Sequence, residues 1–235
     1  MMINMIFLYY DNPQMLQLQI ECWNSYEGAL REMLEIILID DGSPKTFASD
    51  VVRRQKCKIP IRVYRIQEDI PWNFAGARNL GCSEAEDWIY ISDIDTILLA
   101  EDARLLFESH TLEAQKFYLP NRVWLPNMRQ ASIALVNLLF HKEKYLEIGG
   151  YDEDYAGNYG REETDFYNRL KRVATKINRE DVVIRAVPPS LVADSRTITQ
   201  RPRDKTRNAE IYERKLAAGF PKPVNPLRFT WERVL

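Results

Sequence analysis

The stretch Trp88-Ile89-Tyr90-Ile91-Ser92-Asp93-Ile94-Asp95-Thr96 is the one around which the chain is organised. Its first four residues are aromatic or β-branched, which predicts a short buried strand. Two carboxylates, Asp93 and Asp95, follow where that strand would leave its sheet. In open α/β sheets ligands bind at the carboxyl ends of strands, and paired carboxylates suit a hard cation that also binds phosphate. The alternative is an acidic turn whose aspartate caps a helix beginning near Ala100.

The composition is that of an ordinary globular protein. The 235 residues are 46% hydrophobic and 28% charged, with a formal net charge of −2. No overall field therefore favours nucleic acid or an anionic membrane as a partner. The charge is uneven, because residues 194–235 hold ten Lys and Arg against five Asp and Glu. This basic tail is a candidate for contact with phosphates.

The cysteines and the first residues bear on the location of the protein. Cys22, Cys57 and Cys82 are far apart and form no metal-binding spacing, which indicates a reducing compartment. Residues 1–10 lack the basic flank of a signal peptide and read as a strand. No apolar run is long enough to span a bilayer. We therefore expect a cytoplasmic protein without a membrane span.

The first hundred residues alternate between strand and helix patterns. Strands are predicted at 3–10, 34–39, 61–66 and 88–91, and helices at 14–26, 47–56 and from 73 onward. Such alternation predicts an α/β fold in which helices flank a mostly parallel central sheet. The second half is less regular. Strands are predicted there at 116–125, 132–140 and 182–187, and helices at 141–146, 161–173 and 204–218.

Four separated segments occur in the order of one family's motifs. They are Asp40-Asp41-Gly42-Ser43, Asn73 with Gly76-Ala77-Arg78-Asn79, Asp93-Ile94-Asp95, and Gly149-Gly150-Tyr151-Asp152-Glu153 with the stretch 160–166. Together they resemble the inverting nucleotide-sugar glycosyltransferases of the second sequence family, over residues 3–196. The resemblance implies the Rossmann-like GT-A fold at 1–198, with a nucleotide-binding half (1–100) and an acceptor half (101–198). A basic helical extension is expected at 199–235.

The stretch 162–170 is more closely similar to the animal galactosyltransferases that act on N-acetylglucosamine and to the related chondroitin-type polymerases. Those enzymes carry Glu-Asp-Asp-Asp before an Ile/Phe-x-Asn-Arg-Leu run. Here Glu163 stands at the second acidic position and Thr164 at the third. A carboxylate therefore remains at the position of the proposed base.

The resemblance implies a divalent metal ion, Mn²⁺ or Mg²⁺. Such an ion neutralises the charge of a departing nucleoside diphosphate. Asp95 is expected to bind it directly, and Asp93 to face the ribose or to reach the metal through water. Asp194 stands where the galactosyltransferases place a histidine ligand before Ser-Arg, so it is expected as the third ligand. The alternative for Asp194 is an ordinary loop aspartate.

The resemblance also implies a donor pocket, with UDP as the expected carrier. Asp41 is expected to accept a hydrogen bond from the imide N–H of the base, and Arg78 to contact the base or the diphosphate. The alternatives are an Asx-turn for Asp41 and a solvated helix position for Arg78. The expected donor-binding residues are Tyr10, Asp11, Asp41, Asn73, Arg78 and Asp93.

The acceptor side requires one general base, because inversion proceeds by direct attack of an acceptor hydroxyl. Glu163 is the candidate, since it lies near the start of a helix after a glycine-rich loop. Glu162 and Asp165 are expected to bind sugar hydroxyls, and Trp124 and Tyr151 to stack on sugar rings. The alternatives are acids that only complement the helix dipole and aromatic residues that pack in the core.

These features favour a metal-dependent inverting glycosyltransferase that moves a sugar from a nucleotide-sugar donor to a hydroxyl of a glycan or another acceptor. The basic segment 196–207 is expected to close over the donor diphosphate, or else to be a solvated helix face. A third alternative for this segment is that the acceptor is itself a polyanion, such as nucleic acid or an anionic glycan, but the chain has no RNA- or DNA-binding motif to support it.

Two other functions remain open from the sequence. A nucleotidyltransferase on a similar sheet would use the same acids and metal, but it usually needs a basic glycine-rich loop after its first strand. The residues there are Asp11-Asn12-Pro13. The second open function is that of a non-catalytic module that binds a nucleotide sugar or a carbohydrate. The retained acids Asp41, Asp93, Asp95 and Glu163 argue against it.

Overall fold

The computed structural model describes residues 1–108, 111–131, 135–193, 201–224 and 227–235. In chain order its elements are β1 (Ile3–Tyr9), α1 (Pro13–Asn24), α2 (Ala29–Glu32), β2 (Leu34–Asp40), α3 (Ala48–Gln55), β3 (Ile61–Ile66), α4 (Phe74–Glu84), β4 (Trp88–Asp93), β5 (Thr96–Leu98), α5 (Ala100–Phe107), β6 (Lys116–Trp124), β7 (Arg129–Gln130), β8 (Leu138–His141), α6 (Lys142–Ile148), the 3₁₀ turn η1 (Glu153–Tyr155), α7 (Glu162–Val173), β9 (Thr175–Ala186), α9 (Thr206–Ala217) and β10 (Trp231–Arg233).

The strands form one sheet in the order β10-β3-β2-β1-β4-β8-β6-β9-β5, with β7 paired to β6. The neighbours β3, β2, β1 and β4 are parallel, and so is the pair β6–β9. The strands β8, β5, β7 and β10 join antiparallel. The predicted α/β fold with helices around a central sheet is therefore confirmed. Its parallel part is mainly the first half of the chain, and the second half makes the sheet mixed.

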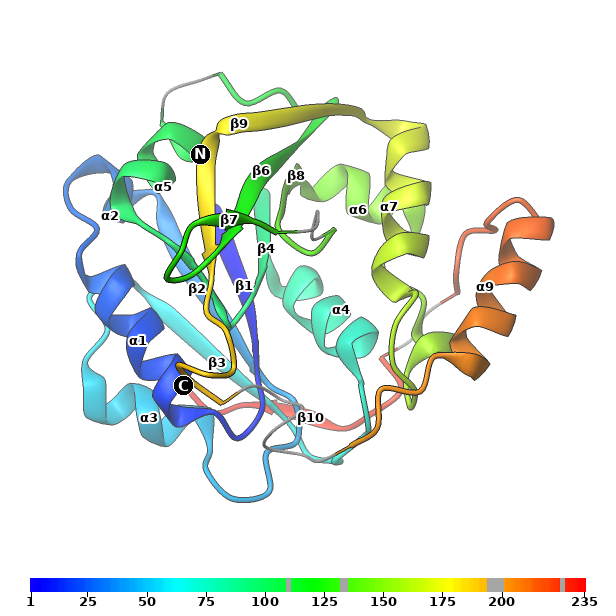
Figure 1. Cartoon of the computed structure of the whole chain (residues 1–235), viewed down its shortest axis with the longest axis horizontal. Helices are drawn as coiled ribbons and strands as arrows, with labels where there is room; N and C mark the ends of the chain where they lie inside the picture. Colours follow the sequence, from blue (N-terminus) through cyan, green and yellow to red (C-terminus); the bar gives the residue numbers. More distant parts are fainter. Residues whose placement is uncertain (109–110, 132–134, 194–200, 225–226) are drawn as a thin grey trace.

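The core lies on both faces of the sheet, and β1 shows why. All seven of its residues are buried. Met5 and Phe7 pack into the apolar cluster that includes residues of α1 and α3, whereas Ile6 and Leu8 pack into the cluster with residues of α4 and α7. Successive side chains of a strand point to opposite faces, so a continuous apolar run suits a strand covered on both sides. Figure 1 shows α1, α3 and α5 on one side of the sheet and α4, α6 and α7 on the other.

A buried asparagine fixes α4 against the loop before η1. Asn79 Oδ1 accepts hydrogen bonds from the hydroxyl of Tyr145 at 2.9 Å and from the backbone N–H of Tyr151 at 2.8 Å. Its Nδ2 donates to the carbonyl of Tyr151 and to Glu153 Oε1. Gly150, at φ +74°, leaves room for this contact, because a Cβ there would lie 2.7 Å from Asn79 Oδ1. The helix that carries Arg78 is thereby held in one position.

A buried ion pair fixes α7 against the same loop. Arg169 Nη2 lies 2.6 Å from Asp165 Oδ2, and both side chains are buried. Arg169 Nη1 also donates to the carbonyls of Ile148 and Gly150, at 2.8 and 2.6 Å. These bonds satisfy charges that would otherwise be costly to bury. They also hold the start of α7 beside the carboxyl ends of the parallel strands.

The end of the chain returns to the central sheet. The helix predicted at 204–218 is present as α9, whereas the strand β10 was not predicted. Trp231 and Arg233 of β10 pair antiparallel with Ile66 and Tyr64 of β3. Figure 1 shows α9 at the margin of the molecule and the C-terminus near α1. In the part of the chain that the structure describes, no helix combines the length and the apolar character needed to cross a bilayer.

Residues 132–140 were predicted as one strand, and this prediction was too long. Residues 132–134 lie outside the described part. Leu135 and Val136 form a turn, and β8 begins only at Leu138. The buried side chain of Asn137 donates from its Nδ2 to Ser92 Oγ at 2.8 Å and to Thr96 Oγ1 at 3.2 Å. This bond places the turn beside the end of β4.

Replacing Gly81 with alanine tests the packing of α4 on β1. The added Cβ would lie 2.5 Å from Ile6 Cγ2, a stiff β-branched position in the core. Overpacking of this kind costs about 1–3 kcal/mol, which exceeds the gain of about 1 kcal/mol in helix propensity. Gly81→Ala should therefore lower the melting temperature by a few degrees in a calorimetric scan. The exposed Ser83→Ala on the same helix is the control and should leave it nearly unchanged. Equal melting temperatures for the two variants would contradict this packing.

Candidate functional site

A cavity of about 430 Å³ opens where β1, β2 and β4 end. The first turns of α4 and α7 and the segments that precede α7 and α9 complete its wall. Ligands of open α/β sheets bind at this edge, because the carboxyl ends of parallel strands meet there. The predicted site residues that line the cavity are Tyr10, Asp41, Arg78, Asp93, Asp95, Glu162 and Glu163.

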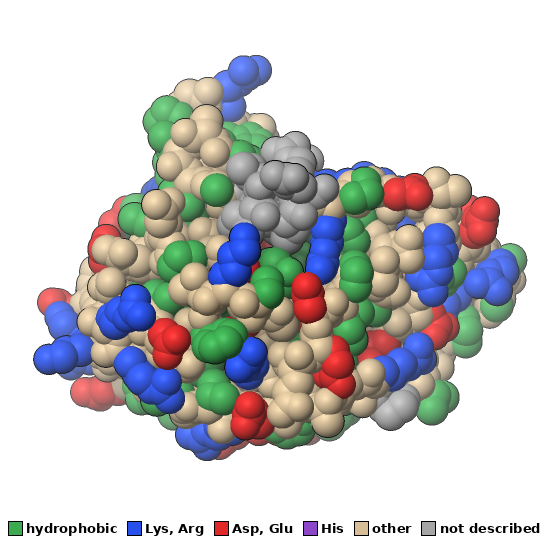
Figure 2. All heavy atoms as spheres, turned by 90° about the horizontal axis from the view of Figure 1, so that it is seen from below, with side chains coloured by type: hydrophobic (Ala, Val, Ile, Leu, Met, Phe, Trp, Pro, Cys, Tyr) green, Lys and Arg blue, Asp and Glu red, His purple; other side chains and the backbone are tan. Residues whose placement is uncertain are grey.

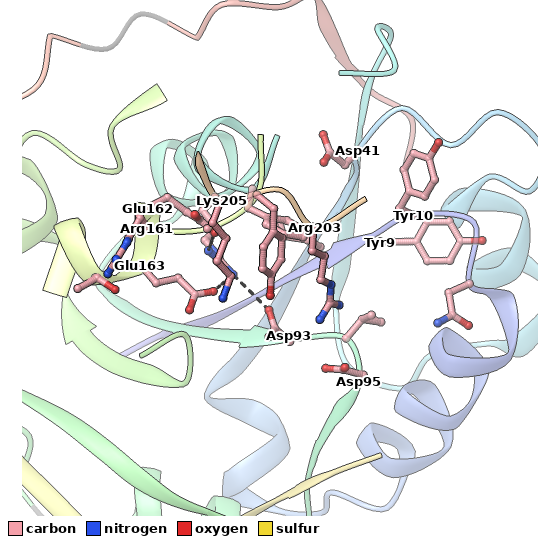
Figure 3. Close-up of a pocket in the computed structure, with 18 residues that line it drawn as sticks. Tyr9, Tyr10, Asp41, Asp93, Asp95, Arg161, Glu162, Glu163, Arg203 and Lys205 are labelled. Atoms are coloured by element: carbon pink, nitrogen blue, oxygen red, sulfur yellow. Dashed lines mark hydrogen bonds and ion pairs between the residues drawn. The ribbon is translucent and has the colours of Figure 1, made fainter. Parts of the chain in front are cut away.

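The labelled side chains are arranged in sequence along the cavity (Figure 3). Asp41 and Tyr10 lie at one end, and Glu162 and Glu163 lie at the other. Asp93 lies between these ends, and Asp95 lies across the cavity from Asp41 in this view. The cavity therefore has a buried carboxylate at one end, the Asp93 and Asp95 carboxylates toward its middle and opposite side, and an acid pair at its far end.

Asp41 is oriented by its neighbours rather than by a turn. The preceding residue, Asp40, is the one that caps the loop, because it accepts from the backbone N–H of Ser43 at 3.0 Å and of Ala48 at 2.8 Å. Asp41 is left to face the cavity, and Asn73 Nδ2 donates to its Oδ1 at 3.0 Å. Burial raises the pKa of Asp41 to about 7, although the bond from Asn73 lowers it. Asn73 does not itself line the cavity, so its contact is with Asp41.

The two residues at the end of β1 differ in their surroundings. Tyr10 lines the cavity, and its hydroxyl donates to Asp69 at 3.2 Å. The carboxylate of Asp11 accepts instead from the backbone N–H of Thr46 at 2.7 Å and of Lys45 at 3.3 Å. Asp11 therefore ties the loop after β2 to the end of β1 and lies outside the cavity wall. The donor contact predicted for it finds no support in this geometry.

Arg78 is a buried residue and not a solvated helix position. Its side chain is 1% exposed, and its Nη2 lies 3.2 Å from Asp93 Oδ1 and 3.1 Å from Glu163 Oε1. Its guanidinium carbon lies 5.5 Å from the ring centroid of Phe74 and 5.4 Å from that of Tyr151. One cation thus joins the middle of the cavity to the acid pair at its far end.

The acid pair at the start of α7 is held in a poorly solvated position. Burial raises the pKa of Glu163, against the lowering effect of Arg78. Burial and the charge of Glu163 raise the pKa of Glu162 to about 7, while Arg78, 4.0 Å away, lowers it. Glu163 is the more accessible of the two, with a side chain that is 31% exposed against 6% for Glu162. An accessible carboxylate with a raised pKa is a stronger base than an ordinary carboxylate, which suits the removal of a proton.

Three residues predicted to contact the acceptor lie outside the cavity wall. Tyr151 is fully buried and stacks on Phe166, with 3.9 Å between ring centroids and 5° between planes. The core-packing alternative therefore describes its position. Asp165 is also buried and is engaged by Arg169, so its carboxylate is not available to a sugar. Trp124 is 36% exposed at the end of β6 and remains accessible to a ligand.

Oxygen ligands for a cation are present at the middle of the cavity. Asp93 and Asp95 both line it, and carboxylate oxygens are the donors that Mg²⁺ and Mn²⁺ prefer. The donor set therefore fits such an ion. Asp194, predicted as a third ligand, lies outside the described residues. Among the residues that are described, no cluster of three or more His, Cys, Asp and Glu side chains suited to a metal is present.

Two cations and a tyrosine that were not among the predicted site residues also line the cavity. Arg203 and Lys205 lie over the ring of Tyr159, at 4.8 and 5.5 Å from its centroid, and all three line the cavity. The two cations belong to the basic segment expected near a diphosphate. Tyr159 was not predicted as a site residue. Its position between two glycines, in the loop before the candidate base, could have indicated it. Figure 2 shows Lys and Arg side chains interspersed with Asp and Glu on the lower face of the molecule.

Solved structures with a similar fold come from S. aureus TarS. The complex of TarS 1–349 with UDP-GlcNAc has a TM-score of 0.70 at 12% identity, and the match covers 94% of this chain and 66% of that chain. TarS 1–349 alone has a TM-score of 0.61 at 14% identity, with 80% of this chain and 61% of that chain covered. The present chain spans less than two thirds of the length of these structures. At such identities the likeness concerns the fold. The search of curated proteins finds no match.

Two family models match the sequence itself. The model described as N-terminal domain of galactosyltransferase matches residues 116–187. The model of glycosyl transferase family 2 matches residues 18–147, which is more than half of the chain. The two matches together include the ends of β2 and β4 and the start of α7, where the cavity lies. The chain is therefore a member of glycosyl transferase family 2, with the GT-A fold.

Proposed function

We propose that the protein transfers a sugar from a UDP-sugar to an acceptor hydroxyl, with inversion at the anomeric carbon and with the help of a divalent metal ion. The observation that carries this proposal is that Asp41, Asp93, Asp95 and Glu163 line one cavity, with Asp93 between Asp41 and Glu163. That order matches the order of base, diphosphate and sugar in a nucleotide sugar. The UDP and UDP-GlcNAc complexes of the similar TarS structures support UDP as the carrier.

The end at Asp41 receives the base. A carboxylate held by Asn73 accepts the imide N–H of uracil, and the ring of Tyr10 lies in the same part of the cavity. A buried carboxylate that must accept this bond rejects bases that present no N–H at that position, because a polar group would be left unpaired. Asp41 therefore provides selectivity for the base.

The middle of the cavity receives the diphosphate. Asp93 and Asp95 would hold Mn²⁺ or Mg²⁺, which when bound supplies Lewis-acid stabilisation of the leaving diphosphate. The side chains of Arg203 and Lys205 provide further positive charge in the cavity wall. Residues from β4 and from the segment before α9 thus face the same group of the donor.

The end at Glu163 receives the acceptor. As the acceptor oxygen attacks the anomeric carbon, a Glu163 carboxylate oxygen takes the hydroxyl proton. The bond between the anomeric carbon and the diphosphate oxygen breaks, and its electron pair leaves with the diphosphate. Arg78 holds Glu163 in position through the 3.1 Å contact to its Oε1. Glu162, buried beside it, is placed to hydrogen-bond a sugar hydroxyl.

The loop after β1 disfavours the nucleotidyltransferase alternative. Asn12 Oδ1 accepts from the backbone N–H of Met15 and so caps α1, and Pro13 has no N–H to offer a phosphate. A measurement of turnover distinguishes a transferase from the binding-module alternative, because only a transferase is expected to hydrolyse a donor sugar slowly. A cytoplasmic location is part of this proposal, in keeping with the free thiols of Cys22, Cys57 and Cys82.

Asp95→Asn tests the metal-binding role. The substitution keeps the shape of the side chain but removes its charge, so UDP affinity in the presence of Mn²⁺ should fall at least tenfold, or by about 1.4 kcal/mol. Calorimetric titration with and without Mn²⁺ measures this. Asp50→Asn on α3 removes a carboxylate that does not line the cavity, and this control should bind like the wild type. Unchanged Mn²⁺-dependent affinity in Asp95→Asn would remove Asp95 from the metal site.

Glu163→Gln tests the general base. Loss of a positioned base slows transfer by about 10²–10⁴-fold, whereas UDP binding should stay at the wild-type value. Release of UDP from UDP-sugars, followed with and without a panel of glycan acceptors, measures the rate. If Glu163→Gln turns over as fast as the wild type, the base lies elsewhere.

Asp41→Asn tests the role of the buried carboxylate through pH. The unfolded Asp pKa is about 4, and burial raises the folded pKa to about 7. The contribution of Asp41 to the stability of the wild-type protein is therefore fully present below the unfolded pKa. It is lost as the pH rises toward the folded pKa. The difference in melting temperature, Asp41→Asn minus wild type, should increase from pH 5 to pH 8. The variant should also bind UDP more weakly than the wild type. A difference that is constant over this range would show that Asp41 does not titrate there.

A further inference from the structure

A small ribbon beside the site presents two arginines and an exposed tryptophan together. In the pairing of β6 with β7, Trp124 lies opposite Arg129, and opposed residues of antiparallel strands share a face. Arg122 precedes Trp124 by two residues and therefore shares that face. The Arg122 guanidinium lies 5.3 Å from the centroid of the Trp124 indole. The ribbon thus carries a defined group of two cations and an aromatic ring.

Arg122 differs from several other buried or partly buried arginines of the chain in having no carboxylate partner among the described residues. Arg169, Arg179 and Arg185 each lie within 3 Å of a carboxylate oxygen. Within the described residues, no carboxylate comes within 4.0 Å of Arg122 or Arg129, and the buried Nε of Arg122 has no hydrogen-bond partner. Buried polar groups in proteins are almost always paired. An arginine left in this state is suited to an anion that arrives with a ligand.

The position of Arg122 relates this group to the acceptor end of the site. Its positive charge is close enough to Glu163 to lower the pKa of that carboxylate. Arg122 nevertheless does not line the cavity itself, whose wall contains Arg203 and Lys205. The ribbon face therefore offers positive charge near the proposed base but outside the cavity wall.

The ribbon is also built to hold its shape. Gln130 Nε2 donates to Asn121 Oδ1 at 2.6 Å and to the carbonyl of Arg122 at 3.1 Å. The backbone N–H of Ala131 donates to the same carbonyl at 2.9 Å. These bonds fix the backbone from which Arg122 and Trp124 project, so the face is formed before a ligand binds.

We propose that Arg122, Trp124 and Arg129 form an acceptor subsite for a negatively charged group, a phosphate or a carboxylate, carried near the attacking hydroxyl. This inference rests on the proposed function, in which Glu163 activates that hydroxyl. An arginine fork binds the oxygens of either anion in two parallel hydrogen bonds, and an indole packs on the carbon skeleton of a sugar or polyol.

Electrostatics explains why an anionic acceptor needs this face. Glu162, Glu163, Asp93 and Asp95 gather near the place of reaction and would repel a second negative charge. Two arginines at the ribbon offset that repulsion and fix where the anion lies. A neutral acceptor would meet no such repulsion and would leave the Nε of Arg122 unpaired. The subsite therefore selects charged over neutral acceptors.

The test uses the indole N–H signal of Trp124 in ¹H–¹⁵N spectra of the full chain with UDP and Mn²⁺, assigned by its loss in Trp124→Phe. The probes are glucose, glucose 6-phosphate and glucuronate. We expect the signal to shift at concentrations at least tenfold lower for one or both anionic sugars than for glucose. The stronger of the two identifies phosphate or carboxylate as the preferred group. An equal response to all three sugars, or none, would overturn the proposal.

Variants complete the experiment. Arg122→Gln should abolish the preference for the anionic sugar, Arg122→Lys should retain part of it, and the exposed Arg54→Gln on α3 should behave as wild type. A preference that survives in Arg122→Gln would contradict the assignment. UDP affinity is measured on the same samples by calorimetry. Wild-type protein that does not bind UDP refutes the proposed function, whereas normal UDP binding without anion preference refutes only the subsite.

Discussion

The charge of Arg78 is the constraint on which the site depends. A buried guanidinium is costly unless anions compensate it, and here the compensating carboxylates come from two other elements, Asp93 at the end of β4 and Glu163 at the start of α7. The same Nη2 atom contacts both. Because the three groups are needed to neutralise one another, the end of β4 must lie beside the N-terminal parts of α4 and α7. These ends of the three elements form part of the wall of the cavity.

The supporting contacts keep these ends from shifting. Asn79 lies next to Arg78 in α4 and uses both atoms of its amide group on the loop 149–153, while Arg169 of α7 reaches the same loop from the other side. The cavity thus combines a rigid wall with carboxylates of raised pKa, such as Asp41 and Glu162. Sites that hold charges in poorly solvated positions lose stability in exchange for chemistry, which is typical of enzymes.

Much of this arrangement could be predicted from local sequence. Apolar runs located the strands that end at Asp41 and Asp93, and parallel pairing brings such ends together. Other features depend on contacts between distant segments. β10 pairs with β3 across about 165 residues, and Asp11 turned out to bond the backbone of Thr46. Tyr151 and Trp124 were equivalent candidates in sequence, and only packing against Phe166 separates the buried ring from the exposed one.

In the proposed mode of binding, a nucleotide sugar lies along the cavity in one direction, with its base at Asp41 and its anomeric carbon toward Glu163. A crystal structure of the protein with UDP and Mn²⁺ measures this directly. We predict the uracil imide within hydrogen-bond distance of Asp41, and the diphosphate and metal beside Asp93 and Asp95. A base bound at the Glu163 end, or a diphosphate remote from both aspartates, would contradict it.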